Sequence, residues 1–305
     1  MARTPPDRTL DWVLGVIGAG ARIVESRTLH GDEPPWQLRI EDSSGTTHAV
    51  LRIPTPPAIN ASMVATGAAA LELAERHGLL APRLIDADLQ GDKSGVSATL
   101  ETLVTGTTAW PATSSVERLR AAGAALARVH TVVMAPREHL PFRPRPIAVD
   151  HFAHARQKGW MPTTPLLQAA DDVIRAHGLP LGETVFVHGD AWPGNLLWAG
   201  DEVAALVDWK TAGVGAPGVD VSELRKQVAI IFGPEAPDLV LEGWERATGT
   251  KARDVAYWDA VAALNTRTEL DDGYRSGGWA PLLDTAGATH RRDEFLRVAL
   301  TNLGS

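Results

Sequence analysis

The segment 184–208 constrains the fold of this chain more than any other stretch. It starts with a short apolar run rich in β-branched and aromatic residues, which predicts the end of a buried strand. The motif His188-Gly189-Asp190 interrupts this run, and two further apolar runs at 196–198 and 203–207 follow. The pattern predicts a strand, a loop and a hairpin. Together they would bring the carboxylates of Asp190 and Asp208 and the amide of Asn195 to one end of a small sheet.

These three side chains have the order and spacing of the residues in a kinase catalytic loop. Asn195 follows Asp190 by five positions, and Asp208 closes the apolar run at 203–207. A kinase catalytic loop has an Asp, four intervening residues and an Asn, with a metal-binding Asp on the following hairpin. One carboxylate orients the attacking hydroxyl, while oxygen ligands hold Mg²⁺. An alternative is that Asp190 and Asn195 are ordinary turn residues, because Asp, Asn, Gly and Pro are common in loops.

The pattern HGDxxxxN, followed by an apolar strand that ends in Asp-Trp, resembles the aminoglycoside phosphotransferase and choline kinase family. The resemblance implies a kinase-like α+β fold with two lobes. The N-terminal lobe would be small and mainly antiparallel β, and the C-terminal lobe larger and mostly α-helical. It also implies that Asp190 is the catalytic base and that Asn195 and Asp208 bind Mg²⁺.

Three strands are expected in the N-terminal lobe, at 22–29, 36–41 and 46–53, followed by a helix over 59–77. Arg52 aligns with the strand cation that binds nucleotide phosphates in kinases. The loop around Gly31 is a poor phosphate cradle, because it adds acids and prolines to a single glycine. In the resembled family the helix supplies a Glu to the strand cation, but Gly67 stands at that position here. Arg52 must therefore pair elsewhere, unless the helix is rotated or shifted.

A further strand over 96–103 leads into the expected hinge, where the backbone of Glu101 and Leu103 would meet the nucleotide base. We therefore place the nucleotide-binding lobe at 1–104 and the catalytic and substrate-binding lobe at 105–305. Helical spacing and capping signals predict the helices of the second lobe, near 116–133, 164–178, 221–232, 237–247, 253–270 and 291–300.

An acidic cluster lies near the end of the helix expected over 253–270. Glu269, Asp271 and Asp272 could bind the ammonium groups of a substrate, or they could be a solvated helix end. Acids at a helix C-terminus oppose the helix dipole, which slightly favours a functional reason for them. After Asp208, Asp220 opens a helix and is expected to be its N-cap and a support residue.

Composition narrows the function further. The chain has 305 residues, no cysteine and a net charge of −8, which excludes disulfides and thiolate chemistry and argues against nucleic-acid binding. No apolar run reaches transmembrane length, so we expect no membrane partner and a cytoplasmic location. The acidic excess weakly favours cationic substrates, although solubility alone explains it.

The sequence thus predicts a small-molecule kinase that transfers the γ-phosphoryl group of ATP or GTP, with Mg²⁺, to a hydroxyl of an aminoglycoside-like or other cationic antibiotic. HGDAWPGN, with Trp192, also resembles fructosamine kinases, so a metabolite kinase of the fructosamine or choline kinase type is an alternative. A non-catalytic nucleotide-binding protein is another, which the poor loop at Gly31 and the residue at Gly67 favour. The presence of Asp190, Asn195 and Asp208 together opposes it.

Overall fold

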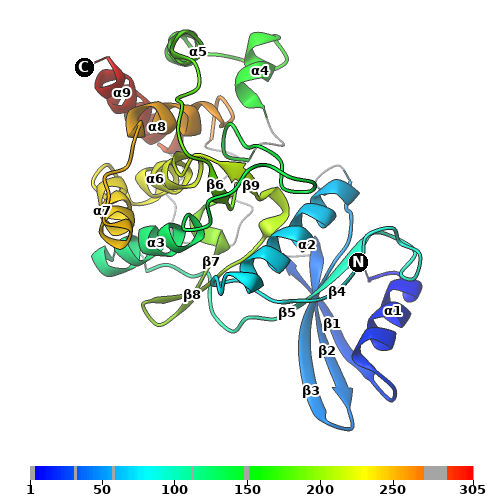
Figure 1. Ribbon diagram of the computed structural model, residues 1–305. Coiled ribbons are helices and arrows are strands. Elements are labelled where there is room, and N and C mark those ends of the chain that lie inside the picture. Colours follow the sequence, from blue (N-terminus) through cyan, green and yellow to red (C-terminus); the bar gives the residue numbers. More distant parts are fainter. Residues whose placement is uncertain are drawn as a thin grey trace. The chain divides into compact units, whose positions relative to one another are not determined.

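The computed structural model describes residues 4–30, 33–56, 59–111, 113, 115–147, 151–270 and 287–304. The chain forms two compact units (Figure 1). The N-terminal unit comprises Met1–Thr105 together with Ala205–Lys210, and the C-terminal unit comprises Gly106–Ala204 and Thr211–Ser305. The sequence division at 104/105 differs in two respects, because it assigned both Thr105 and 205–210 to the second lobe.

The N-terminal unit is built on a five-stranded antiparallel sheet, as the resemblance implied. Its strand order is β1-β2-β3-β5-β4. The strands are β1 (Arg22–His30), β2 (Glu33–Asp42), β3 (Gly45–Arg52), β4 (Leu84–Asp88) and β5 (Ala98–Thr102). The phosphate loop expected at Gly31 falls between β1 and β2, and Gly31 and Asp32 lie outside the described residues.

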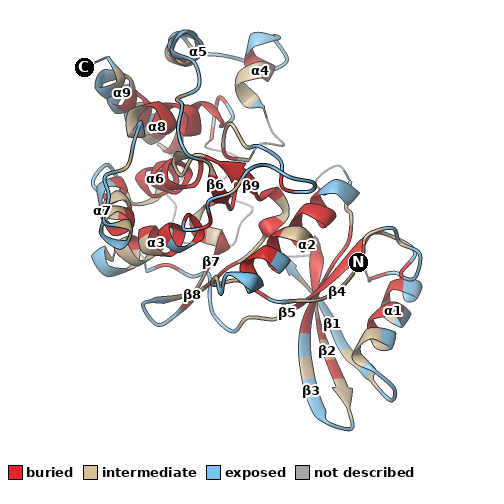
Figure 2. Cartoon of the chain, viewed as in Figure 1, coloured by how far each residue is buried: buried red, intermediate tan, exposed pale blue. Residues whose placement is uncertain are grey.

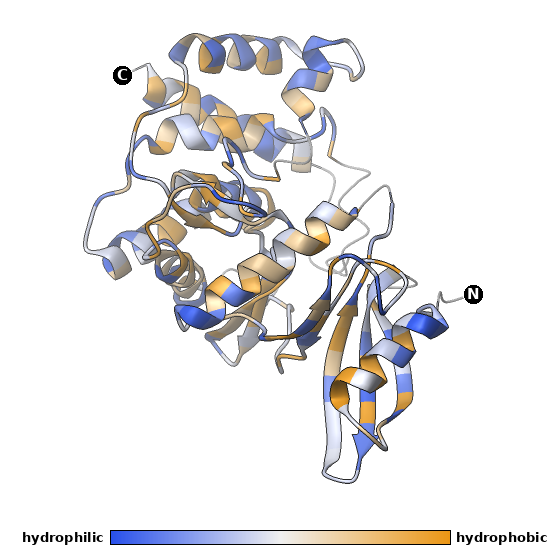
Figure 3. Ribbon diagram, turned by 45° about the vertical axis from the view of Figure 1, so that its right-hand side comes forward, coloured by the Kyte–Doolittle hydropathy of each residue, from blue (hydrophilic) through white to orange (hydrophobic). Residues whose placement is uncertain are grey.

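The alternation of side chains along the strands places apolar residues on one face of this sheet and Arg52 on the other. Leu51 and Leu100 are paired in register on β3 and β5 and are fully buried against the helix α1 (Asp7–Ile17), which contributes Trp12 and Val13. Successive strand residues point to opposite faces, so Arg52 lies on the face away from α1. Figure 3 shows the same pattern as apolar and polar bands along these strands.

The helix α2 (Ala61–Arg76) also belongs to this unit. It begins at Asn60, whose side chain accepts a hydrogen bond from the Met63 N–H, the usual way to satisfy a free donor at a helix start. The side chains of Met63 and Val64 in its first turn are buried together with that of Ile59, which precedes the helix. The helix expected over 59–77 is therefore present, two residues shorter at its start.

The C-terminal unit is mostly helical, with α6 at its centre. Every residue from Val219 to Ile230 is buried, and Figure 2 shows α6 buried over most of its length. A helix that is buried all round lies in the core of a large domain rather than at its surface. The helices of this unit are α3 (Val116–Val129), α4 (Phe152–Gln157), α5 (Pro165–His177), α6 (Gly218–Phe232), α7 (Ala236–Thr248), α8 (Val255–Leu264) and α9 (Ala288–Leu303).

Two glycines allow α3 and α7 to approach closely. A Cβ atom at Gly123 would lie 2.0 Å from the Val240 carbonyl oxygen, and one at Gly243 would lie 2.1 Å from that of Arg120. Both contacts are with backbone atoms, which cannot move aside without shifting a helix. The close α3–α7 packing is therefore set by these two residues.

The segment 184–208 contains short strands, as predicted. β6 (Val185–Val187) precedes the loop, and β7 (Leu196–Ala199) pairs with β8 (Glu202–Leu206). β6 pairs antiparallel with β9 (Gly213–Gly215), a strand that sequence reasoning missed because its two glycines indicate a turn. The short helices η1 (Pro193–Asn195) and η2 (Trp209–Thr211) complete this region.

Two helix predictions need correction. The helix expected over 253–270 ends at Leu264, and α4 was not predicted at all.

In the described part of the chain, none of the helices has both the length and the apolar character needed to cross a membrane.

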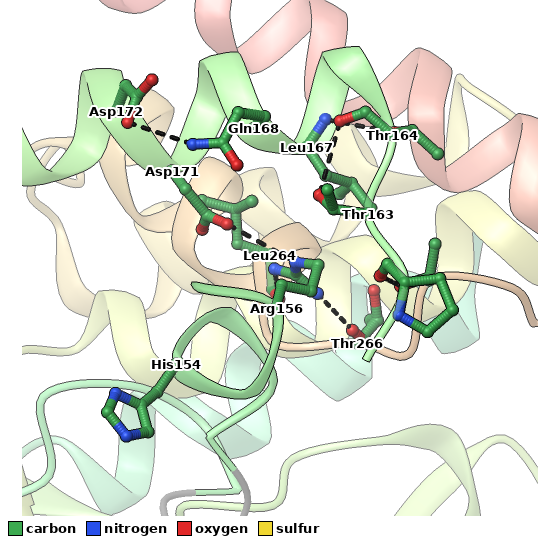
Figure 4. Close-up of polar contacts among 12 residues, drawn as sticks. His154, Arg156, Thr163, Thr164, Leu167, Gln168, Asp171, Asp172, Leu264 and Thr266 are labelled. Carbon is green, nitrogen blue, oxygen red and sulfur yellow. Dashed lines mark hydrogen bonds and ion pairs between the residues drawn. The ribbon is translucent and has the colours of Figure 1, made fainter. Parts of the chain in front are cut away.

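The backbone beyond α8 is held by two buried arginines. Arg156 of α4 donates to the carbonyl oxygens of Leu264 and Thr266, at 2.6 and 2.9 Å, and pairs with Asp171 of α5 at 3.4 Å (Figure 4). Arg292 of α9 donates to the Thr266 hydroxyl and to the carbonyls of the next two residues. Charged donors therefore end α8 early, by satisfying carbonyl groups that a longer helix would have bonded internally.

We expect Arg156→Met to lower the free energy of unfolding by about 3–5 kcal/mol, because it leaves a buried carboxylate and two buried carbonyl groups without their charged donor. Urea denaturation followed by circular dichroism measures this change. Arg175→Met is the matched control, since Arg175 makes an exposed ion pair with Asp172 on α5. It should cost less than about 1 kcal/mol. Equal losses in the two variants would contradict the anchoring role of Arg156.

Candidate active site

The loop between β6 and β7 brings two of the predicted residues together. The side-chain nitrogen Nδ2 of Asn195 donates to the backbone carbonyl of Asp190 at 2.9 Å and to its carboxylate oxygen Oδ2 at 3.2 Å. Asn195 is buried, whereas Asp190 is only half-buried. Both bonds use Nδ2, so neither of them occupies the amide oxygen Oδ1 of Asn195. The spacing HGDxxxxN therefore creates one side-chain pair, as predicted.

Gly189 is required at the bend of this loop. Its φ of +79° lies in the left-handed region, which other residues adopt only with strain. A Cβ atom there would also lie 2.3 Å from the carbonyl oxygen of Thr211. The glycine thus lets the chain turn sharply and pass close to the backbone that follows η2.

A buried carboxylate fixes the start of the loop. Asp220 of α6 is fully buried and accepts hydrogen bonds from the backbone N–H groups of His188, at 2.7 Å, and Gly189, at 2.8 Å. It does not cap its own helix, so the expected N-cap role is wrong, while the expected support role is correct. Sequence reasoning could place Asp220 near a helix start but could not see that its partners lie about thirty residues upstream.

A second layer holds Asp220 itself. His130, the residue after α3, lies 3.1 Å from the Asp220 carboxylate through Nε2, while its Nδ1 accepts from the Trp244 indole N–H at 2.9 Å. Because Nδ1 is an acceptor, the ring proton of a neutral His130 must be on Nε2, where it is donated to Asp220. Trp244 of α7 thus orients His130, His130 orients the Asp220 carboxylate of α6, and Asp220 holds the backbone of the loop.

Tryptophans support the other end of the loop. The Trp110 indole N–H donates to the Pro193 carbonyl at 3.2 Å, and its ring packs edge-on against Trp198 of β7. The Trp192 ring lies against Gly194, where an added Cβ would come within 2.4 Å of the ring atoms. The AWPG sequence is thus explained by packing, with the indole covering the glycine.

The N-terminal unit holds a separate buried cluster around Arg52. Its Nε lies 3.2 Å from the Glu101 carboxylate of β5, and its Nη1 lies 3.1 Å from Oδ1 of Asp208. Burial lowers the pKa of the Arg52 guanidinium, but the two carboxylates outweigh burial and raise its pKa above the ordinary value. Arg52 is therefore a permanent cation at this position, and it does pair with acids outside α2.

Asp208 lies in the segment 205–210, which packs within the N-terminal unit. The Leu206 N–H donates to the Leu80 carbonyl, and the Trp209 indole donates back to the Leu206 carbonyl, both at 2.8 Å. Asp208 has a φ of +67°, a left-handed conformation that redirects its side chain out of the β8 line. Lys210 contacts the Asp208 oxygen Oδ2, so both carboxylate oxygens face cations. Sequence reasoning did not identify Lys210.

The hinge residues have two different surroundings. The side chain of Glu101 is buried against Arg52 and also accepts from the Thr99 hydroxyl at 3.1 Å. The Leu103 N–H donates to the His48 carbonyl, which extends the β3–β5 pairing by one step beyond β5. The side chain of Glu101 therefore belongs to the Arg52 cluster. Binding of the nucleotide base by the backbone of Glu101 or Leu103 stays a prediction.

The donor set fits magnesium. Asn195 and Asp208 offer an amide and a carboxylate oxygen, the hard ligands that Mg²⁺ prefers. Within the described residues no group of three or more His, Cys, Asp or Glu side chains forms a cluster that could hold a metal alone. Mg²⁺ commonly binds through one or two protein ligands plus substrate phosphates, so it does not need such a cluster.

The acids expected to bind substrate are only partly visible. Glu269 is exposed and lies five residues beyond the end of α8, so the helix-dipole argument for it does not apply. Asp271 and Asp272 lie outside the described residues. The anchored segment 264–268 leads directly into Glu269.

We expect Asp220→Asn to loosen the catalytic loop. An amide group offers an oxygen on one side only, so at least one of the three donors that face Asp220 would lose its acceptor, at a cost of about 1–3 kcal/mol. Hydrogen exchange followed by mass spectrometry should show faster exchange in the peptide that contains His188 and Gly189. Asp201→Asn, in the exposed turn that pairs with Arg118, is the control and should leave that peptide protected. Unchanged exchange in Asp220→Asn would refute the anchor.

Comparisons with known proteins identify the family and the fold of this chain. A family model described as the phosphotransferase enzyme family (APH) matches residues 31–264. No curated protein matches the sequence. Solved structures show the same fold at low identity. An amicoumacin kinase in complex with AMP-PNP and Ca²⁺ is 12% identical, with a TM-score of 0.63, over 96% of this chain and 94% of the other.

Two further structures show similar agreement. A thermostable mutant of the aminoglycoside phosphotransferase APH(4)-Ia, bound to AMP-PNP and hygromycin B, is 15% identical, with a TM-score of 0.60, over 97% and 98% of the two chains. A Thermobifida fusca YX-ER1 protein with a provisional fructosamine-3-kinase assignment is 18% identical, with a TM-score of 0.55, over 92% and 94%. The two-lobed α+β fold expected from the sequence is thereby confirmed. With its HGDxxxxN loop and a family match over most of its length, this chain belongs to the phosphotransferase enzyme family.

Proposed function

We propose that this protein transfers the γ-phosphoryl group of ATP or GTP to a hydroxyl of a small cationic molecule, of the kind found in aminoglycoside-like antibiotics. The observation that carries the proposal is the contact between Asn195 and Asp190 in a loop fixed by Asp220. Asp190 is half-buried, so its carboxylate remains accessible to a substrate hydroxyl. It would orient that hydroxyl and accept its proton.

The phosphates and the metal would be bound by the other members of the motif. Arg52 supplies a permanent positive charge and a planar fork of donors suited to phosphate oxygens. Asn195 and Asp208 would hold Mg²⁺, whose charge would offset the negative charge of the phosphates. The backbone near Glu101 and Leu103 would bind the nucleotide base, and Glu269, Asp271 and Asp272 would face ammonium groups of the acceptor.

The acceptor class rests on likeness and charge. Structures with this fold include kinases bound to hygromycin B and to amicoumacin, and the chain carries a net charge of −8. Antibiotic resistance and a cytoplasmic location would follow from that activity. The alternative is a metabolite kinase of the fructosamine or choline kinase type, which the Trp192-Pro193-Gly194 sequence and the Thermobifida fusca structure favour. A non-catalytic nucleotide-binding protein would have no need of both Asp190 and Asn195 in contact.

We expect Asp190→Ala to lose turnover by a factor on the order of 10²–10⁴ while it still binds nucleotide, because the general base acts on the acceptor and not on the nucleotide. Phosphoryl transfer from radiolabelled ATP measures turnover, and calorimetry measures binding. Asp201→Ala, in the β7–β8 turn, serves as the control and should keep both properties. Wild-type turnover in Asp190→Ala would show that the role is wrongly assigned.

We expect Asp208→Ala to lose the Mg²⁺-dependent part of nucleotide binding, since the variant lacks one of the two proposed metal ligands. Titrating a non-hydrolysable triphosphate with Mg²⁺, and again with EDTA, isolates that part. In the wild type the two titrations should differ, and in the variant they should coincide. A variant that keeps the wild-type difference would exclude Asp208 as a ligand.

The acceptor is best identified with the wild-type protein. A thermal-shift screen with a non-hydrolysable nucleotide would compare aminoglycosides, other cationic antibiotics, fructosamines and choline. Compounds that raise the melting temperature would then be tested as phosphoryl acceptors and, for antibiotics, in growth assays with and without expression of the protein. Phosphorylation of fructosamines or choline alone would favour the metabolite kinase, and slow nucleotide hydrolysis with no acceptor at all would still exclude a non-catalytic protein.

A further inference from the structure

The partner of Arg52 is on a strand, not on a helix. In protein kinases the strand cation is paired with a Glu from the helix that corresponds to α2. Here that helix position is Gly67, and the ion pair is formed instead with Glu101 of β5. This relocation is an observation of the structure that neither the family match nor the motif spacing contains.

Strand register explains how Glu101 reaches Arg52. On the antiparallel pair β3–β5, Arg52 is opposite Thr99 and Val50 is opposite Glu101. Arg52 and Glu101 are therefore diagonal neighbours on one face, a separation that long side chains can bridge. Their side chains are 9% and 6% exposed, so the 3.2 Å contact between Nε and Oε1 is shielded from water and is little weakened by salt.

Glu101 is itself held in place. Its Oε1 accepts from the Thr99 hydroxyl, at 3.1 Å, as well as from Arg52. With Nε bound to Glu101 and Nη1 bound to Asp208, the guanidinium plane has two fixed points. Two charge-assisted contacts from different directions define the orientation of a planar group far better than one. Without the strand acid, Arg52 would keep, among its contacts in the described residues, the one with Asp208, which would also bind the metal.

Packing does not explain the glycine on α2. A Cβ atom at Gly67 would lie 3.9 Å from the Lys210 backbone, an ordinary van der Waals contact. The space therefore tolerates at least a small side chain. With Glu101 already beside Arg52, a helix acid has no remaining task at this position.

We propose that Glu101 is a positioning residue that orients Arg52 toward the nucleotide phosphates, taking the role that a helix Glu has in protein kinases. The proposal rests on the proposed function, because it needs Arg52 to bind phosphate. The Glu101 carboxylate contacts the Arg52 guanidinium and the Thr99 hydroxyl, so it would act on the nucleotide through Arg52. The requirement for an acid has thus moved from α2 to a strand adjacent to β3.

The test compares Mg²⁺-ATP with AMP as ligands of Glu101→Gln, since ATP offers three phosphate groups to a phosphate-binding arginine and AMP offers one. We expect ATP affinity to fall about tenfold and AMP affinity to fall much less. A purely structural defect would weaken both by the same factor. Glu41→Gln is the matched control, because Glu41 forms exposed ion pairs with Arg22 and Arg39 in the same sheet. It should keep the wild-type ratio of the two affinities.

A second background tests whether Glu101 works through Arg52. In Arg52→Met, which removes the cation, the further change Glu101→Gln should leave ATP affinity unaltered. An additional tenfold loss there would overturn the proposal, as would a wild-type ATP-to-AMP ratio in Glu101→Gln alone. If Glu101→Gln does not fold, the comparison of Arg52→Met with Arg52→Met/Glu101→Gln still decides between the outcomes.

The proposed function can fail separately. If the wild-type protein binds no nucleoside triphosphate in the presence of Mg²⁺, both proposals are wrong. If the wild type binds ATP more tightly than AMP and Glu101→Gln does the same to the same degree, only the role of Glu101 is wrong.

Discussion

The position of the candidate catalytic loop depends on the buried carboxylate of Asp220. This carboxylate accepts hydrogen bonds from two backbone N–H groups of the loop. It is oriented by His130, which is oriented in turn by Trp244. A buried charge is tolerated only when its hydrogen-bonding capacity is used, and here at least three donors converge on it. The most buried helix of the C-terminal unit thereby determines where Asp190 stands, although Asp190 itself is half-buried. Rigidity comes from α6 and accessibility from the loop, the combination that a general base needs.

The N-terminal unit applies a different constraint, the alternation of side chains along strands. Leu51 and Leu100 face α1, so their neighbours Arg52 and Glu101 must face the other way. Sheet register then makes the ion pair, with no contribution from α2. Because β3 and β5 are joined by backbone hydrogen bonds, the orientation of Arg52 is tied to the sheet and is insensitive to small movements of the helix. In protein kinases the corresponding pair joins a strand to a helix, and helix position controls it. If Arg52 binds phosphate as proposed, this arrangement would keep its guanidinium permanently oriented.

Much of the fold could be predicted from the sequence because its signals are local. The strands around 22–53, the helix α3 and the HGDxxxxN loop follow from periodicity, caps and turn residues. The partners of Asp220 and Arg52 could not be predicted, since they are separated by thirty or more positions and depend on register and helix packing. The early end of α8 was missed for a related reason. Two arginines from distant helices bind the carbonyl groups of Leu264 and of the residues that follow it, and no pattern within 253–270 reports them. The strand β9 was missed because its two glycines are typical of a turn.

The short segment 205–210 belongs to the N-terminal unit although residues 106–204 of the other unit precede it. During synthesis, the first 105 residues leave the ribosome without the carboxylate that completes the Arg52 cluster. At ordinary elongation rates that carboxylate arrives on the order of 5–20 s later. Until then Arg52 has Glu101 but lacks Asp208, and the carbonyl of Leu80 lacks the amide of Leu206. The N-terminal unit therefore receives its last segment only after residues 106–204 have been made, and a fragment cut after residue 105 would lack the Asp208 and Leu206 contacts of this lobe.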